Sequence, residues 1–171
     1  MTTTMNRLPV STWNPLGVNY APASAALPTV PADGWAKAEI LSPALPAGVT
    51  VPAEADFTDF AASGMGAETC LTIDAAEGSS LTVVQVVRGD AEDGVSANLT
   101  RIRAAEGAHV VLVQVQLLGS RARRWNAVAI EQGTSARVEQ VRIELGGAVV
   151  ACGTRTLLNH NKCEYALDAV Y

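Results

Sequence analysis

The second half of the chain alternates short turns with strongly patterned strands. Three segments begin with a small turn and continue into a strand: EGSSLTVVQVV, EGAHVVLVQVQLLG and QGTSARVEQVRIELGG. Their first glycines are Gly78, Gly107 and Gly133, and Asn161 occupies the equivalent place in the segment that follows. The steps between these four positions are nearly equal, and a constant period of this length is typical of proteins built from stacked repeats.

A second set of strand-like segments lies between the members of the first set. They are VSANLTRIRA from Val95, WNAVAIEQ from Trp125 and VVACGTRTLL from Val149. Two strands in each period predict an all-β fold, a β-helix (β-solenoid) with two strands per coil. Regular short strands also suit a β-sandwich, but the nearly constant period and the equivalent turn residues favour the solenoid.

The segment ARVEQVRIEL shows the clearest alternation of apolar and charged residues. We expect its charged residues, which include Arg142 and Glu144, to form the solvent-exposed face of the strand. The apolar residues Val138 and Val141 are three positions apart instead of two. This step predicts a bulge or a corner near Gln140.

The segment 1–68 has no sustained period and is predicted to be irregular and to pack on a solenoid formed by 69–171. Short strands are expected around Ala38–Leu41 and Val49–Val51, and one helical turn is expected within Pro52–Phe60. The chain stops inside a strand, so we expect a solenoid that is truncated at its C-terminal end, either naturally or by design.

Composition narrows the function classes. The net charge of −5 argues against a nucleic-acid partner held by phosphate contacts. The one tight basic cluster, Arg121, Arg123 and Arg124, is expected to be a solvated loop between strands. No apolar run approaches the roughly 20 residues that span a bilayer, and the first residues lack the pattern of a secretory signal. Three cysteines in such a chain are most simply reduced thiols of a cytoplasmic protein.

Candidate chemistry is sparse. The densest constellation is Cys152, His160, Cys163 and Glu164, and His160 with Cys163 has a possible spacing for zinc or iron–sulfur ligation. A closed site needs four ligands, however, and free cysteines are commonly small buried hydrophobic residues. We therefore predict no metal site and retain Cys152, His160 and Cys163 only as candidates.

No motif predicts an enzyme. The chain has no phosphate-binding loop, G-x-S-x-G or H-E-x-x-H sequence, so no catalytic and no cofactor-binding residue is assigned. Because many β-helices act on or bind carbohydrate, a carbohydrate-acting or carbohydrate-binding solenoid is the alternative function. Such a protein needs a groove of acidic and aromatic residues, and an aromatic content of 5% argues against it.

Several segments resemble a known family. The sequences TWNPLGVN, LPAGVTV, EGAHVVLVQVQLLG and NAVAIEQGTSARVEQVRIEL are similar to the SufB/SufD family of the SUF iron–sulfur cluster assembly system, most closely to its SufD branch. The resemblance extends from about Thr12 to Tyr171 and implies a right-handed β-helix. It further implies a non-enzymatic cytoplasmic scaffold that acts through protein–protein contacts.

The resemblance also implies partners. These are a SufB-like β-helical protein, a SufC-like ATPase bound by a C-terminal helical region, and an iron–sulfur cluster in the full complex. The late functional residues and the helices of that family have no counterpart in this chain, so no functional residue is transferred. Open strands near Tyr171 predict that the chain associates with itself; nucleic acid and membrane are not expected as partners.

Overall fold

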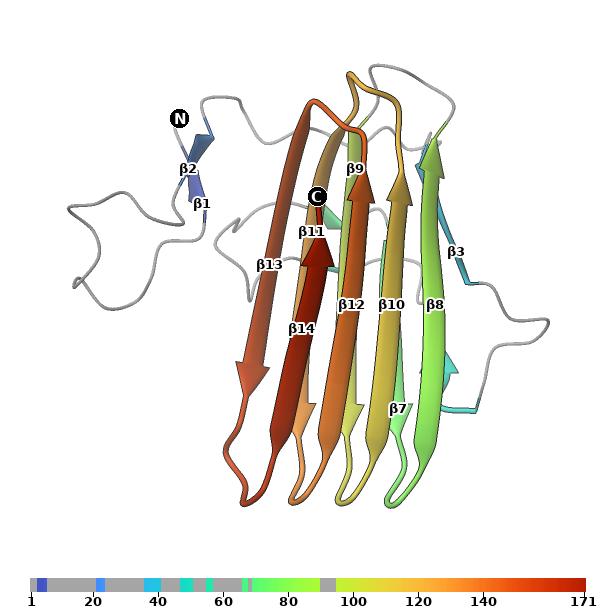
Figure 1. Ribbon diagram of the computed structural model, residues 1–171, viewed down its shortest axis with the longest axis vertical. Coiled ribbons are helices and arrows are strands. Elements are labelled where there is room, and N and C mark those ends of the chain that lie inside the picture. Colours follow the sequence, from blue (N-terminus) through green and yellow to red (C-terminus); the bar gives the residue numbers. More distant parts are fainter. Residues whose placement is uncertain are drawn as a thin grey trace.

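The structure is a computed structural model that describes residues 3–5, 21–23, 36–40, 47–50, 55–56, 66–67, 69–89 and 95–171. Every regular element in these ranges is a strand (Figure 1). The short strands are β1 (Thr3–Met5), β2 (Ala21–Ala23), β3 (Ala36–Ile40), β4 (Val49–Thr50), β5 (Ala55–Asp56) and β6 (Gly66–Ala67). The long strands are β7 (Thr69–Ala75), β8 (Ser80–Gly89), β9 (Val95–Ala104), β10 (His109–Leu117), β11 (Arg123–Gln132), β12 (Arg137–Leu145), β13 (Val149–Leu157) and β14 (Glu164–Val170).

The long strands alternate between two sheets, and within each sheet they pair parallel with one another. One sheet has the order β14-β12-β10-β8-β3 and the other has the order β13-β11-β9-β7-β4. In Figure 1 the strands β8, β10, β12 and β14 lie side by side in front of β7, β9, β11 and β13. Each long strand therefore pairs with the strand two places further along the chain, as in a β-solenoid with two strands per coil. The fold class predicted from the sequence is confirmed.

The coils stay in register with one another. Ser80 of β8 pairs with His109, His109 pairs with Arg137, and Arg137 pairs with Glu164, so successive coils are nearly equal in length. The register of β12 against β10 runs without interruption from Arg137 to Leu145. The expectation of a bulge or corner near Gln140 is therefore wrong. The apolar residues Val138 and Val141 are three positions apart because the inward position between them is occupied by a polar residue, Gln140.

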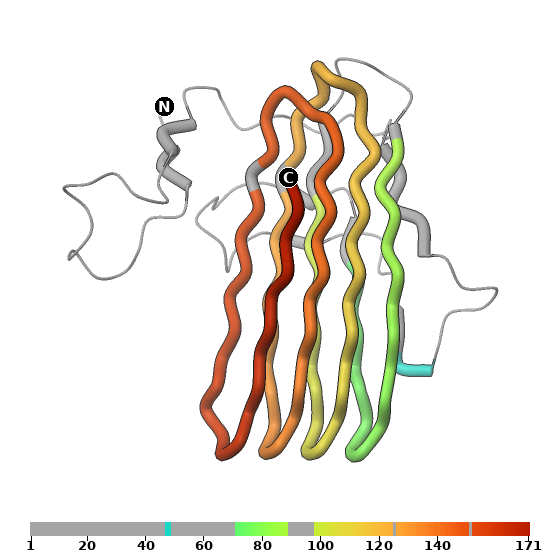
Figure 2. Tube along the Cα trace, viewed as in Figure 1, coloured from blue at the N-terminus to red at the C-terminus, as the bar shows by residue number. Residues whose placement is uncertain are grey.

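The turns between the two sheets stack in a row at one end of the molecule (Figure 2). Each turn contains one residue in the left-handed conformation, namely Gly78, Gly107, Ser135 or Lys162. The N–H of Gly78 donates to the carbonyl of Glu106 at 2.9 Å, and the N–H groups of Gly107 and Ser135 make the same contact with the next coil at 2.9 Å. The equivalent turn residues are therefore these four.

Two of the four residues that the sequence pattern placed at equivalent turn positions, Gly133 and Asn161, are not the left-handed residues of their turns. Gly133 lies two positions before the left-handed residue of its turn, and Asn161 lies one position before it. A Cβ atom at Gly133 would lie 2.8 Å from the backbone nitrogen of Glu106. This glycine is therefore required by the close approach of two coils, not by a positive φ.

The N-terminal part contributes edge strands. β3 pairs antiparallel with β8, and β4 pairs antiparallel with β7, in agreement with the short strands expected there. The helical turn expected within Pro52–Phe60 differs: its described part, Ala55–Asp56, is β5, paired with β6. A single helical turn fixes several residues for one hydrogen bond, and strand pairing is the alternative that the chain adopts here. The remaining residues of that segment lie outside the described ranges.

The interior of the solenoid is apolar next to the stacked turns. The side chains that form this core are small and branched, and they come from both sheets: Leu71, Ile73, Ala75, Val83, Ile102, Ala104, Ala108, Val110, Leu112, Val128, Ile130, Ala136 and Val138. Each is at most 5% exposed. Further along the strands the inward positions become polar, and these positions form the candidate site.

Candidate functional site

Polar side chains fill the half of the interior that lies away from the stacked turns. They belong to several coils, and each is at most 5% exposed: Gln85, Asn98, Thr100, Gln114, Gln116, Arg124, Asn126, Gln140, Arg142 and Glu144. The expectation that Arg142 and Glu144 lie on the solvent-exposed face is therefore wrong. The outward positions of the same part of β12 are Val141, Ile143 and Leu145, the last of which is exposed.

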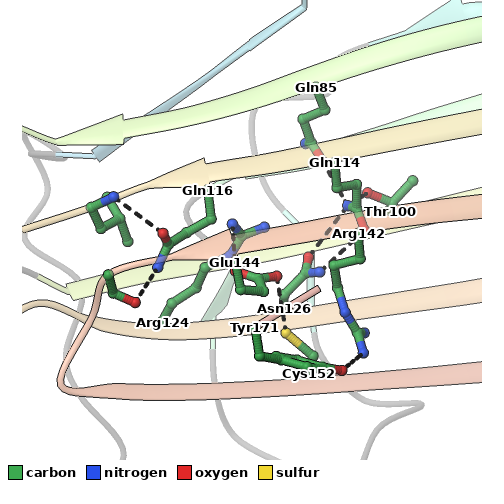
Figure 3. A network of polar contacts seen from close by, with 12 residues as sticks. Gln85, Thr100, Gln114, Gln116, Arg124, Asn126, Arg142, Glu144, Cys152 and Tyr171 are labelled. Carbon is green, nitrogen blue, oxygen red and sulfur yellow. Dashed lines mark hydrogen bonds and ion pairs between the residues drawn. The ribbon is translucent and has the colours of Figure 1, made fainter. Parts of the chain in front are cut away.

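Gln114 is at the centre of a network of side-chain amides (Figure 3). Its amide nitrogen donates to Gln85 Oε1 at 2.7 Å. Its amide oxygen accepts hydrogen bonds from Asn126 Nδ2 at 3.2 Å and from Gln140 Nε2 at 3.0 Å. The network links three consecutive strands of one sheet, β8, β10 and β12, with β11 of the other sheet. Because buried polar groups are costly when unpaired, this network favours one register of the coils.

The network continues into the last coil through Gln140. Its amide oxygen accepts hydrogen bonds from Thr154 Oγ1 at 3.1 Å and from the hydroxyl of Tyr165 at 2.8 Å. Burial raises the pKa of Tyr165 above its usual value. The phenol therefore stays protonated and acts as a hydrogen-bond donor at the boundary between the apolar and polar halves of the interior.

Arg124 and Glu144 form a buried ion pair across the two sheets. Arg124 Nη1 lies 3.4 Å from Glu144 Oε2, and the two side chains are 0% and 3% exposed. Burial lowers the pKa of Arg124, and the Glu144 carboxylate opposes this shift; a guanidinium remains charged in proteins. The solvated loop expected at Arg121, Arg123 and Arg124 is therefore wrong for Arg124, which points inward from β11.

Glu144 also accepts a hydrogen bond from the thiol of Cys152. The Cys152 sulfur lies 3.3 Å from Glu144 Oε1. Burial, and secondly the neighbouring carboxylate of Glu144, raise the pKa of this thiol to about 12. Cys152 is thus a neutral donor at physiological pH, which makes it a poor nucleophile and a poor metal ligand in this state.

Arg142 lies one coil away from the end of the chain. Its Nη2 donates to the hydroxyl of Tyr171, and its guanidinium carbon lies 5.6 Å from the centre of the Tyr171 ring. Both contacts hold the aromatic side chain against the end of the polar interior (Figure 3).

The structure does not bring the candidate metal ligands together. Cys152 lies five positions before Leu157, the last residue of β13, which is about 16 Å along an extended strand. His160 and Cys163 lie in the turn beyond that residue, where the thiol of Cys163 contacts the carbonyl oxygens of Gly133 at 3.3 Å and of His160 at 3.2 Å. Among the described residues, no group of three or more His, Cys, Asp or Glu side chains is placed to hold a metal ion.

One signal in the sequence could have revealed the polar interior. Arg124 and Asn126 precede Val128 and Ile130 with a strict period of two, so all four residues face the same side of β11. The inward direction of Val128 then determines that of Arg124. An assignment of faces from polarity alone misses this signal.

These observations define the class of protein as a parallel β-solenoid with a hydrogen-bonded polar interior. Residues 59–171 match the family described as "SUF system FeS cluster assembly, SufBD core domain". The chain belongs to this family, and its role is therefore in iron–sulfur cluster assembly, as the resemblance implied. Comparisons with curated proteins and with solved structures found no match. Within the described ranges, no helix is long and apolar enough to cross a membrane.

Proposed function

We propose that this chain is the solenoid part of a non-enzymatic, SufD-like scaffold that works in the cytoplasm through protein–protein contacts. The observation that carries the proposal is the family match over residues 59–171, which contain the entire run of coils from β7 to β14. The densest polar constellation supports a scaffold as well, because it is enclosed within the coils and its central residue, Gln114, is fully buried.

The proposed partners are a SufB-like β-helical protein and a SufC-like ATPase that bind the full-length gene product. The iron–sulfur cluster is the cargo of the assembled complex in this proposal. Parallel strands with an unpaired edge offer backbone groups to a second β-structured chain. The family match therefore supports a β-helical partner more directly than the carbohydrate-acting alternative, which it does not favour.

Affinity purification from native lysate tests this proposal. The tagged full-length gene product and the present chain are used as separate baits, and the bound proteins are identified by mass spectrometry. We expect the full-length bait to recover an ABC-type ATPase and a second β-helical protein. Recovery of neither, together with binding of the chain to a polysaccharide panel, would contradict the scaffold and support the carbohydrate alternative.

The last coil supports a further proposal, that the chain associates with itself. The side chains that face inward from this coil are only partly covered: Leu167 is 40% exposed and Tyr171 is 77% exposed. The edges of β13 and β14 each have a paired strand on one side only. Apolar side chains next to unpaired backbone groups favour strand addition by a second copy.

A further inference from the structure

The polar interior contains guanidinium groups that lack hydrogen-bond acceptors. Nε and Nη2 of Arg124 and Nε of Arg142 are buried and make no hydrogen bond within the protein. Arg124 is 0% exposed and Arg142 is 5% exposed. The contacts made by Glu144 and Tyr171 therefore satisfy only part of the donor capacity of these two side chains.

The same region carries an excess of positive charge. Arg124 and Arg142 are both cations, and Glu144 is the single carboxylate among the buried polar residues of the described ranges. The neighbouring Cys152 is a neutral thiol that donates to Glu144 and so provides no negative charge. Two cations and one anion leave one buried positive charge uncompensated, an arrangement that proteins avoid unless a counter-ion is present.

We propose that the unpartnered guanidinium N–H groups of Arg124 and Arg142, next to Cys152, bind a small monovalent inorganic anion of the halide class. An anion accepts hydrogen bonds from the free guanidinium N–H groups and neutralises the excess charge, whereas water can do only the former. The anion must be small because Arg124 and Arg142 are 0% and 5% exposed, and a protein interior of this kind is closely packed. Figure 3 shows Arg124, Arg142, Glu144 and Cys152 gathered in one part of the interior.

The site lies next to the last coil, which is formed by β13 and β14. Cys152 is only partly buried, and Tyr171, which contacts Arg142, is largely exposed. This inference concerns the interior of the chain itself and does not depend on the proposed scaffold function.

Chloride binding to the purified chain tests the proposal. The line width of the ³⁵Cl NMR signal is measured with wild-type protein, and bromide is added as a competitor. We expect excess line broadening that saturates and that bromide removes. Arg142→Gln preserves the Arg124–Glu144 pair and should weaken chloride binding about tenfold or more, because it removes the uncompensated charge. Arg137→Gln is the matched control: it removes the same charge from an exposed position on β12 and should leave chloride binding unchanged.

A second variant changes affinity in the opposite direction. Glu144→Gln removes the internal carboxylate, so chloride should bind about tenfold more tightly; a purely structural role for Glu144 predicts no such gain. Equal broadening by wild type and Arg142→Gln, or no gain in Glu144→Gln, would overturn the proposal. Anomalous diffraction from wild-type crystals soaked in bromide tests the site without any variant. An anomalous peak between Arg124 and Arg142 supports the site, and the absence of a peak there overturns it.

Discussion

Cys152 marks the point where the polar interior meets the last coil. Its thiol donates to Glu144, and burial followed by the Glu144 carboxylate raises its pKa to about 12. Reactive cysteines have lowered pKa values, because the thiolate is the nucleophile and the metal ligand. The environment of Cys152 therefore favours a structural hydrogen bond.

The raised pKa of Cys152 predicts a loss of stability at alkaline pH. In the unfolded chain this thiol ionises near its ordinary pKa of about 8.5, whereas the native chain retains the proton up to about pH 12. Above pH 8.5 the unfolded state binds fewer protons, so the free energy of unfolding falls as the pH rises. The stabilising contribution is complete below pH 8.5 and is lost between about 8.5 and 12.

Urea denaturation at pH 8 and pH 11 measures this effect against Cys152→Ser. Serine can donate to Glu144 but does not titrate in this range, and the other ionisable groups are common to both proteins. We expect wild type to lose about 3 kcal/mol more than Cys152→Ser between the two pH values, since one pKa unit corresponds to about 1.4 kcal/mol. Equal losses would show that the native thiol is not protected from ionisation.

Gly133 is predicted to be more sensitive to substitution than the glycine of the first turn. A Cβ at Gly133 would meet the backbone of Glu106 at 2.8 Å and of Ala105 at 3.0 Å, whereas a Cβ at Gly78 would meet no atom within 4 Å. Gly133→Ala forces two coils apart and should reduce the free energy of unfolding by about 2–4 kcal/mol. Gly78→Ala bears only the cost of its left-handed φ, about 1–2 kcal/mol. Thermal denaturation of both variants checks the order, and a larger effect at Gly78 would contradict it.

At the level of the strand, hydrophobic periodicity located the elements well and their faces less well. The expected strands from Val95 and from Val149 begin where β9 and β13 begin, and the strand expected from Trp125 begins two positions inside β11. For the residues of β12 after Val138, the predicted inward and outward faces are the reverse of those in the structure. Apolar residues usually face the core, but here hydrogen bonds and an ion pair stabilise polar inward residues, so polarity alone could not indicate the face.

The amide network predicts a large cost for removing Gln114. Gln114→Met has a similar length but leaves the donors of Asn126 and Gln140 and the acceptor of Gln85 without these partners. We expect the free energy of unfolding to fall by about 2–4 kcal/mol. Val113→Thr, at the adjacent outward position of β10, is the control and should change it by less than about 1 kcal/mol. Urea denaturation measures both; an effect of Gln114→Met no larger than the control would show that the network is not stabilising.

For the whole molecule, the constant period determined the architecture, because each coil must repeat the register of the preceding one. The polar contacts of the interior are harder to predict than the coils, because several of them join residues of different sheets. Arg124 on β11 and Glu144 on β12 belong to different strands and meet only when the two sheets face each other. Family membership places the chain in iron–sulfur cluster assembly. The contacts made by the last coil depend on its individual side chains, which the period of the repeats does not determine.

The exposed inward side chains of the last coil lead to a prediction about association. If a second copy adds to β14, a charge at an inward position must be buried in the contact, which is costly, while a charge on the outward face is not. Leu167→Lys should therefore raise the dissociation constant of self-association about tenfold or more. Ala166→Lys adds the same charge at the neighbouring outward position, opposite Glu139 of β12, and should have little effect.

Sedimentation equilibrium over a range of concentrations measures the association of wild type and both variants. Circular dichroism shows whether each variant keeps its strands, so that loss of folding is distinguished from loss of contact. A wild-type chain that remains monomeric at all concentrations would contradict the proposal of self-association. Equal weakening by Leu167→Lys and Ala166→Lys would instead place the contact on the outer face of the sheet, because only there would a charge at Ala166 be as unfavourable as one at Leu167.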